Sequence, residues 1–234
     1  MAIDFSDWDK QCDDLTSNKD KLLKEMTANL QKEESIDVLY RMAKVWLFLA
    51  KKAQKEGNNE MLKSRAEKAY EYADKACKAD PNNFECHKWM CASLGLLANT
   101  SASKEKIKYG HQFKEHADIA LKLKPDDQFI QSMYGQWCYN VATLGWLERK
   151  IGEKLYGKIP TATYKDALNA FKKVHELNAE AKDNHLWMAR TLIADNNRTE
   201  AKQWIQRGLT LKNQTIADEL AHKELEELKN KYCK

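Results

Sequence analysis

The feature that most constrains the fold of this chain is an internal repeat. The segments DALNAFKKVHELNAEA (166–181) and EAKQWIQRGLTLKN (200–213) align at an offset of 34 residues, with small and apolar residues at matching positions. Two earlier copies, EYADKACKADPNNF (71–84) and EHADIALKLKPDDQF (115–129), share an Ala-Asp pair, a helical stripe and a proline. A period of about 34 residues is typical of paired helices that stack on their neighbours to bury a common core.

Residues that favour helices dominate the composition, and residues that break them are few. The 234 residues include three prolines and eight glycines, which argues against a sheet-rich fold with many tight turns. We therefore predict an all-α fold, a right-handed superhelical array of about four tetratricopeptide (TPR)-like helical hairpins with insertions and a C-terminal capping helix. The predicted hairpins pair 36–56 with 60–79, 83–99 with 104–123, 127–145 with 163–178 and 183–195 with 199–211, and helix 215–231 closes the stack.

The start of the chain differs from the rest in charge. Residues 1–37 contain ten acidic residues against five lysines, whereas the remainder has 34 basic and 25 acidic residues. A loose apolar stripe over 5–31 indicates one helix of marginal stability. We therefore divide the chain into an acidic N-terminal segment, 1–35, and a helical-repeat domain, 36–234. The asymmetry suggests an acidic partner for the basic part, or an acidic segment that folds back on it.

An insertion within 137–164 interrupts the repeat. Gly145 and Pro160 bracket a short stretch with helical periodicity. One row of this helix is apolar and a parallel row is basic; the members are Leu147, Ile151 and Leu155, and Lys150, Lys154 and Lys158. We expect the apolar row to pack on the array and the basic row to face solvent. Trp146, at the start of this stretch, is expected in the core.

Basic residues gather in two stretches that suit an acidic partner. The candidate partner-binding residues are Lys104, Lys106, Lys108, Lys114, Lys122 and Lys124 in the first stretch, and Arg149, Lys150, Lys154 and Lys158 in the insertion. Attraction through such exposed charges is salt-sensitive, because screening acts within about 10 Å at ~0.1 M salt. Basic rows on helices are also common as solvated faces without any partner, so the charge pattern alone leaves both interpretations open.

Motifs of catalysis and metal binding are missing from the sequence. It contains no G-x-S-x-G motif, no phosphate-binding glycine loop and no H-E-x-x-H motif. Cys86, His87 and Cys91 are the best metal candidates, but they lack a clear fourth ligand, and we predict no metal and no cofactor. No apolar run approaches the ~20 residues of a membrane span. We therefore expect a cytoplasmic, non-enzymatic protein with no nucleic acid partner.

Several motifs in order along the chain resemble a known family. The motifs are HKW (87–89), YGQWCY (134–139), the pattern formed by Trp146, Arg149, Ile151 and Leu155, and the pattern formed by Pro160, Thr163, Tyr164, Ala167, Leu168 and Phe171. From about residue 36 onward the chain resembles the regulator of microtubule dynamics family. The resemblance implies a TPR-like domain that associates with microtubules and spindle structures. Some relatives are membrane-anchored and one handles phospholipid, whereas we expect no anchor in this chain.

Three functions follow as hypotheses. The first is a non-catalytic microtubule-associated scaffold that acts on microtubule dynamics, the mitotic spindle and chromosome segregation. Its partners would be tubulin and other spindle proteins, at the cytoskeleton, the spindle and the spindle poles, and removal of residues 1–35 would strengthen binding. The second is a lipid-binding or lipid-transfer module, less favoured, with Trp146 and Tyr156 at the mouth of an apolar cavity. The third is an adaptor that grips a peptide in its groove.

Overall fold

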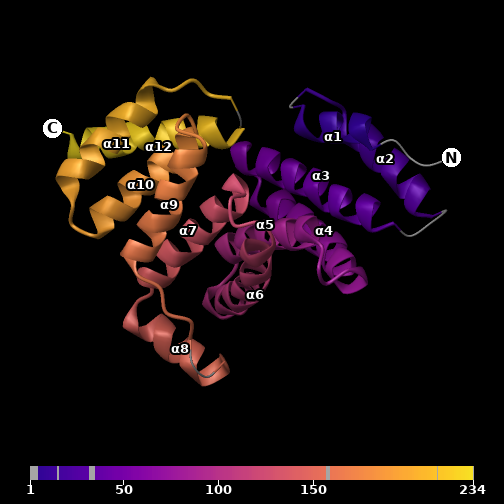
Figure 1. Ribbon diagram of the computed structural model, residues 1–234, viewed down its shortest axis with the longest axis horizontal. Helices are drawn as coiled ribbons and strands as arrows, with labels where there is room; N and C mark the ends of the chain where they lie inside the picture. Colours follow the sequence, from indigo (N-terminus) through magenta and orange to yellow (C-terminus); the bar gives the residue numbers. More distant parts are fainter. Residues whose placement is uncertain (1–4, 15, 32–34, 157–158, 215, 234) are drawn as a thin grey trace. The chain divides into compact units, whose positions relative to one another are not determined.

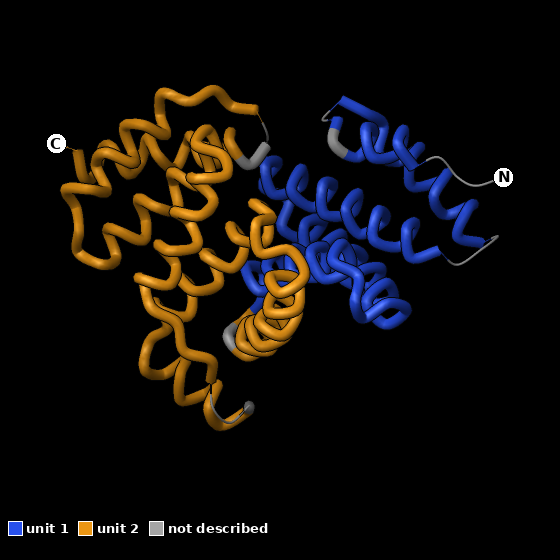
Figure 2. The backbone as a smooth tube through the Cα atoms, viewed as in Figure 1, with its two compact units in different colours: residues 1–101 blue, residues 102–234 orange. Residues whose placement is uncertain are grey.

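The computed structural model describes residues 5–14, 16–31, 35–156, 159–214 and 216–233. These residues form twelve helices and contain no strand (Figure 1), which confirms the predicted all-α fold. The chain divides into two compact units, Met1–Ser101 and Ala102–Lys234, which are coloured separately in Figure 2. Within the described residues, no helix is long and apolar enough to span a bilayer.

The first unit is built on a predicted hairpin. Its helices are α1 (Ser6–Asp13), α2 (Lys19–Leu30), α3 (Ile36–Lys55), α4 (Asn59–Ala79) and α5 (Phe84–Thr100). α3 packs on α4 and α4 on α5, so the expected pairing of 36–56 with 60–79 is confirmed. Between α3 and α4, Gly57 takes a φ of 74°, a left-handed conformation that suits glycine, and the Asn58 side chain caps α4 by accepting from the backbone N–H of Met61.

Small residues let the helices of this hairpin approach closely. The face of α4 that packs inward carries alanines that are fully buried, namely Ala66, Ala69, Ala73 and Ala76. An alanine at each turn leaves room for the larger side chains of the facing helices. This is the small-residue pattern by which the repeat was recognised in the sequence.

Residues 5–31 form two helices where the sequence indicated one. The backbone breaks after α1, and the Asn18 side chain starts α2 by accepting from the backbone N–H of Lys21. Lys19 Nζ donates to the backbone carbonyls of Gln11 and Asp14, which ties the connection between the two helices. Such side-chain contacts to backbone groups are local, and an apolar stripe alone does not reveal them.

The two N-terminal helices belong to the core of the first unit. Leu22 and Met26 of α2 are fully buried, and Trp8 of α1 is nearly so, in one cluster with apolar residues of α3. At the edge of this cluster, the buried guanidinium of Arg41 on α3 donates two 2.8 Å hydrogen bonds to the Asp9 carboxylate. Asp9 of the N-terminal segment therefore holds α1 against α3 through this ion pair.

The second unit contains the last two predicted hairpins. Its helices are α6 (Ser103–Leu123), α7 (Gln128–Ala142), α8 (Trp146–Tyr156), α9 (Tyr164–Leu177), α10 (Lys182–Ala194), α11 (Arg198–Thr210) and α12 (Ile216–Tyr232). α7 packs on α9, α10 packs on α11, and α12 packs on both α10 and α11, as expected for the last two hairpins and their closing helix. The expected pairing of 83–99 with 104–123 joins residues of different units and stays a prediction.

Buried polar contacts attach the closing helix. Lys182 of α10 is 1% exposed, and its Nζ donates to the side chain of Asn213 and to Nδ1 of His222 on α12. Leu225 of α12 is fully buried beside Gly208 of α11. The fit of Leu225 against a glycine brings α12 close to α11, so the end of the array is covered by packed side chains.

Candidate binding surface

Helix α6 presents its candidate lysines as two separate groups. The exposed ones are Lys104 and Lys108 near its start, and Lys122 and Lys124 at its end. The two groups lie roughly 21 Å apart along the helix axis. Between them, Nζ of Lys114 lies 2.7 Å from each carboxylate oxygen of Asp118. That ion pair balances the charge of Lys114 locally, so the middle of α6 offers little positive charge to a partner. Lys106, near the start of α6, is half-buried.

Arg149 of the insertion has a structural role. Its guanidinium donates hydrogen bonds to the backbone carbonyls of Val141, at 2.9 Å, and of Leu144, at 3.3 Å. These carbonyls lie at the end of α7, where a helix leaves acceptors unsatisfied and where positive charge is favourable. Arg149 therefore fixes the start of α8 against the end of α7 and is half-buried there.

The lysines of α8 face solvent, as the sequence predicted. Lys150 and Lys154 are exposed, and Lys150 Nζ lies 3.7 Å from a carboxylate oxygen of Glu153 in a loose surface pair. Pairs of this kind contribute little and exchange readily with a partner's charges. The third member of the predicted row, Lys158, lies outside the described residues.

The expected docking of α8 through its leucine row is wrong. Leu147 is 63% exposed and Leu155 is 40% exposed, while Ile151 is half-buried. Trp146, expected in the core, is 74% exposed. The two leucines of the apolar row are therefore exposed to solvent, as the described lysines of the basic row are.

α8 packs through a glycine in place of the leucines. A Cβ atom placed on Gly152 would lie 2.4 Å from Ile159 Cδ1 and 3.4 Å from Ile107 Cγ2, so these side chains occupy the space beside the bare backbone. Ile107 on α6 and Ile159 after α8 are both buried. A glycine inside a helix costs stability relative to alanine. Here the glycine lets the backbone of α8 approach Ile107 and Ile159 more closely than a leucine would. This explains why the Gly152 side of α8 faces α6.

The contact between α6 and α8 attaches two helices that both carry exposed lysines. Ile107, which contacts the Gly152 site, lies between the exposed residues Lys104 and Lys108 in the first turns of α6. Lys150 and Lys154 lie on the side of α8 opposite to Gly152 and face solvent. We call the exposed lysines of these two attached helices the α6–α8 surface and define it by Lys104, Lys108, Lys150 and Lys154. In Figure 1, α8 lies apart from α10, α11 and α12 of the same unit.

Aromatic residues attach α7 to α6. Trp137 is 7% exposed and stacks between the rings of Phe113 on α6 and Tyr134 on α7. Its indole Nε1 donates a 2.9 Å hydrogen bond to the backbone carbonyl of Gly110. Trp137 is therefore a core residue, as expected, and it joins α6 to α7.

An open depression of about 300 Å³ lies between α7 and α9. It is lined by Gln131, Tyr134, Asp166, Asn169, Ala170 and Lys173. Most of these side chains are polar, which suits a peptide backbone better than an acyl chain. The solvent-facing position of Trp146 also differs from the cavity mouth in which the lipid hypothesis places it. Side-chain detail of Tyr156, the other residue of that hypothesis, lies outside the described part.

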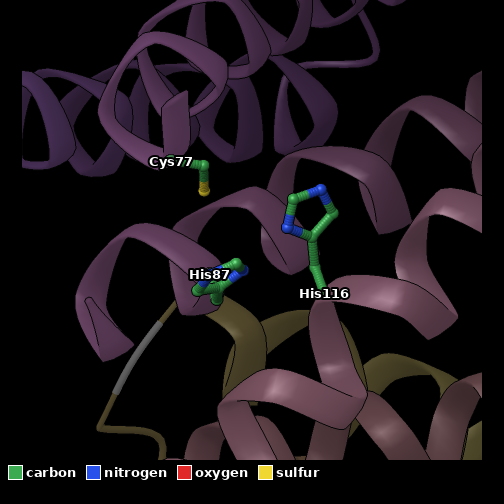
Figure 3. A group of neighbouring side chains, drawn as sticks. All are labelled: Cys77, His87 and His116. Atoms are coloured by element: carbon green, nitrogen blue, oxygen red, sulfur yellow. The ribbon is translucent and has the colours of Figure 1, made fainter. Parts of the chain in front are cut away.

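The candidate metal ligands discussed for the first unit are the buried thiols of Cys77 and Cys86 and the buried imidazole of His87. Figure 3 shows His87 of α5 beside Cys77 of α4, with ligand atoms within 4.8 Å of each other; it also labels His116, which belongs to the second unit. Burial raises the pKa of Cys77 and of Cys86 to about 12, so both thiols stay protonated near neutral pH. Metal ligation needs the thiolate. His87 Nε2 is already 2.8 Å from the backbone carbonyl of Pro81. The expectation of no metal stays a prediction.

A family model and the similar proteins indicate the same family. A family model described as "Regulator of microtubule dynamics protein 1-3" matches residues 4–233. Regulator of microtubule dynamics protein 3 of Bos taurus is 33% identical over 193 residues, 82% of this chain and 40% of that protein. Regulator of microtubule dynamics protein 2 of Homo sapiens is 34% identical over 157 residues, 67% of this chain and 38% of that protein. The chain thus spans about two fifths of the length of these relatives.

A solved structure resembles the fold. The crystal structure of a thermophilic TPR protein from Thermus thermophilus superposes with a TM-score of 0.57, covering 90% of this chain and 91% of that one. The sequence identity is 13%, so this likeness concerns the fold alone. It agrees with the TPR-like hairpins predicted from the repeat.

Proposed function

This chain belongs to the regulator of microtubule dynamics family, and from that premise we propose that it is a microtubule-associated regulator. In this proposal it binds microtubules directly through the α6–α8 surface. The relatives are regulators of microtubule dynamics by name, and the exposed lysines of α6 and α8 supply a charge that suits an acidic tubulin surface. The observation that carries the proposal is the exposure of Lys150 and Lys154 on a helix that is attached at its start by hydrogen bonds to the end of α7.

The attachment of α8 to the rest of the unit favours binding. Gly152 packs against Ile107 and Ile159, Arg149 bonds to the end of α7, and the Glu148 carboxylate accepts from the backbone N–H of Gly145 at 3.0 Å. The lysines therefore project from a helix that is already formed, and a partner need not order the segment when it binds. Their charges attract the acidic tails of tubulin over a distance of about one Debye length, roughly 10 Å at ~0.1 M salt.

The candidate basic residues are expected to contribute unequally. We assign the contact to Lys104, Lys108, Lys150 and Lys154. Lys114 is paired with Asp118 and Arg149 caps α7, so their charges already serve contacts within the protein. Lys122 and Lys124 form a second basic spot at the far end of α6, where this proposal places another tubulin tail.

The action we propose is non-catalytic. The lysines bind and position, and a scaffold of this kind alters microtubule dynamics by stabilising the lattice or by recruiting other spindle proteins. The places of action in this proposal are the cytoskeleton, the mitotic spindle and its poles, with a role in chromosome segregation. The likeness to a TPR protein supports the non-catalytic part, because arrays of this type usually bind other macromolecules.

The test is cosedimentation with microtubules at low and moderate salt. We expect the wild type to pellet in a salt-sensitive manner, and Lys150→Glu/Lys154→Glu to bind roughly tenfold more weakly, since each reversed charge replaces an attraction with a repulsion of ~0.2–1 kcal/mol. The matched control is Lys165→Glu/Lys172→Glu, which reverses two exposed lysines of α9 in the same unit. Equal losses in both variants, or no pelleting of the wild type, would refute direct binding through α8.

A further inference from the structure

The solvent face of α8 contains more apolar surface than microtubule binding requires. Trp146, at 74% exposed, and Leu147, at 63%, are the most exposed large hydrophobic residues in the described part of the chain, and Leu155 of the same helix is 40% exposed. Scattered exposed apolar residues are normal on protein surfaces. Trp146 and Leu147 are adjacent at the start of α8 and form one exposed apolar patch, and such patches mark interaction sites.

Trp146, Leu147 and the two lysines share one side of the helix. Successive residues of a helix are about 100° apart, so Lys150 and Lys154 fall between Trp146 and Leu147 around the helix. Gly152, which packs against Ile107 and Ile159, lies on the opposite side, and Leu155 lies outside the Trp146–Leu147 arc. The free side of α8 is thus a mixed surface, with an indole and a leucine beside two ammonium groups.

A partner that matches this side must be anionic and apolar at once. An extended acidic tail pairs with the lysines but leaves the indole and the leucine in water. A bilayer with anionic lipids provides both properties, because its phosphates lie within a few ångströms of the acyl chains. Tryptophan prefers this interface, and lysine reaches from it to the phosphates.

We propose that α8 docks in the plane of an anionic lipid membrane. Trp146 and Leu147 enter the boundary between headgroups and acyl chains, while Lys150 and Lys154 contact lipid phosphates. The helix lies on the bilayer and does not cross it. This inference goes beyond microtubule binding: the two activities share Lys150 and Lys154, whereas the apolar residues serve the membrane alone. A membrane and a microtubule therefore compete for the same helix.

The experiment uses the full chain with vesicles of phosphatidylcholine, with or without phosphatidylserine, in a flotation assay. We expect the wild type to float with the anionic vesicles and to bind the neutral ones much more weakly. Trp146→Ser/Leu147→Ser should bind anionic vesicles at least about tenfold more weakly, because two apolar side chains no longer leave water. Lys150→Glu/Lys154→Glu should lose the preference for phosphatidylserine, since each lysine contributes roughly fivefold at an anionic surface.

Two controls keep the result interpretable. Leu177→Ser changes another exposed leucine of the same unit, 42% exposed on α9, and should float like the wild type. Trp146 and Leu147 make few contacts with the fold, so the double variant should keep its unfolding temperature and its binding to microtubules. Anionic vesicle binding that is unchanged in Trp146→Ser/Leu147→Ser would overturn the proposal. A second result would also overturn the proposal: the wild type binds no vesicles, and Trp146→Ser/Leu147→Ser loses microtubule binding. In that case the exposed side of α8 would be a protein-docking surface.

Discussion

Gly135 on α7 faces the ring of Phe171 on α9, which is fully buried. A Cβ atom at this position would lie 2.5, 2.8 and 2.9 Å from three atoms of that ring. We expect Gly135→Ala to lower the free energy of unfolding by about 1–3 kcal/mol, because a rigid buried ring cannot move aside without shifting α9. Urea unfolding followed by tryptophan fluorescence measures the change.

The matched control for that substitution is Gly110→Ala in α6. The nearest atom to a Cβ there is Trp137 Nε1 at 3.9 Å, an ordinary contact. Alanine is favoured over glycine within a helix, so we expect this control to gain roughly 0.5–1 kcal/mol. Equal free energies of unfolding for Gly135→Ala and Gly110→Ala would contradict the close packing of α7 on α9.

Single residues also explain why one part of the site escaped sequence reasoning. The row of Leu147, Ile151 and Leu155 is a good apolar stripe, and periodicity alone places such a stripe against the core. The choice of face was decided by Gly152, whose missing side chain fits against Ile107, a residue 45 positions earlier in the chain. A glycine inside the helical pattern was the one available signal, and its partner cannot be read from local spacing.

At the scale of the element, the N-terminal helices are structural parts of the first unit. Met26 of α2 is fully buried in the cluster that α3 completes. Met26→Ala should therefore lower the free energy of unfolding by about 2–5 kcal/mol, through lost burial and a cavity. Lys24→Ala, an exposed change in the same helix, should stay within about 0.5 kcal/mol of the wild type. Equal stability of the two variants would contradict the packing of α2.

This packing changes how the acidic segment can be tested. The expectation that removal of residues 1–35 strengthens microtubule binding remains a prediction, but deletion also exposes the apolar face of α3, including Val38, Met42 and Val45. A truncated chain would unfold or aggregate for that reason alone. Point substitutions that keep the helices separate the effect of charge from the effect of folding.

Helix positions were more predictable than contacts. The ends of α3, α4 and α9 to α11 lie within one or two residues of the predicted bounds, because caps such as Asn58, Thr163 and Asn197 are encoded locally. The break between α1 and α2 was missed, since Lys19 finds its carbonyl partners only once the turn is formed. Local signals predicted where helices begin, and tertiary packing decided which faces meet.

At the scale of the whole molecule, charge is distributed unevenly along the chain. Asp7 and Asp20 are exposed acids of the N-terminal helices, whereas Asp9 is bonded to Arg41. If the acidic segment opposes binding to acidic tubulin, Asp7→Asn/Asp20→Asn should strengthen microtubule binding by roughly twofold or more at low salt. The control Glu56→Gln/Glu60→Gln removes two exposed acids of the α3–α4 turn. An equal effect of both pairs would show a general response to net charge and no special role for the segment.

The membership in a family of microtubule regulators could be recognised from motifs, but the mode of contact required a structure. The sequence places basic residues on two stretches, and only the packing of α6 on α8 joins Lys104 and Lys108 with Lys150 and Lys154 in one unit. It also shows that Lys114 and Arg149, equally basic in the sequence, already serve internal contacts. The proposed surface is therefore smaller than the set of basic residues that the sequence suggests.

The most direct test of a direct electrostatic contact is the affinity of the wild-type chain for intact microtubules and for microtubules whose acidic tubulin tails have been removed by limited proteolysis. The account predicts salt-sensitive binding to intact microtubules that falls about tenfold without the tails, since several lysines lose their partners together. Equal affinity for both kinds of microtubule, or no binding to intact ones, would contradict it.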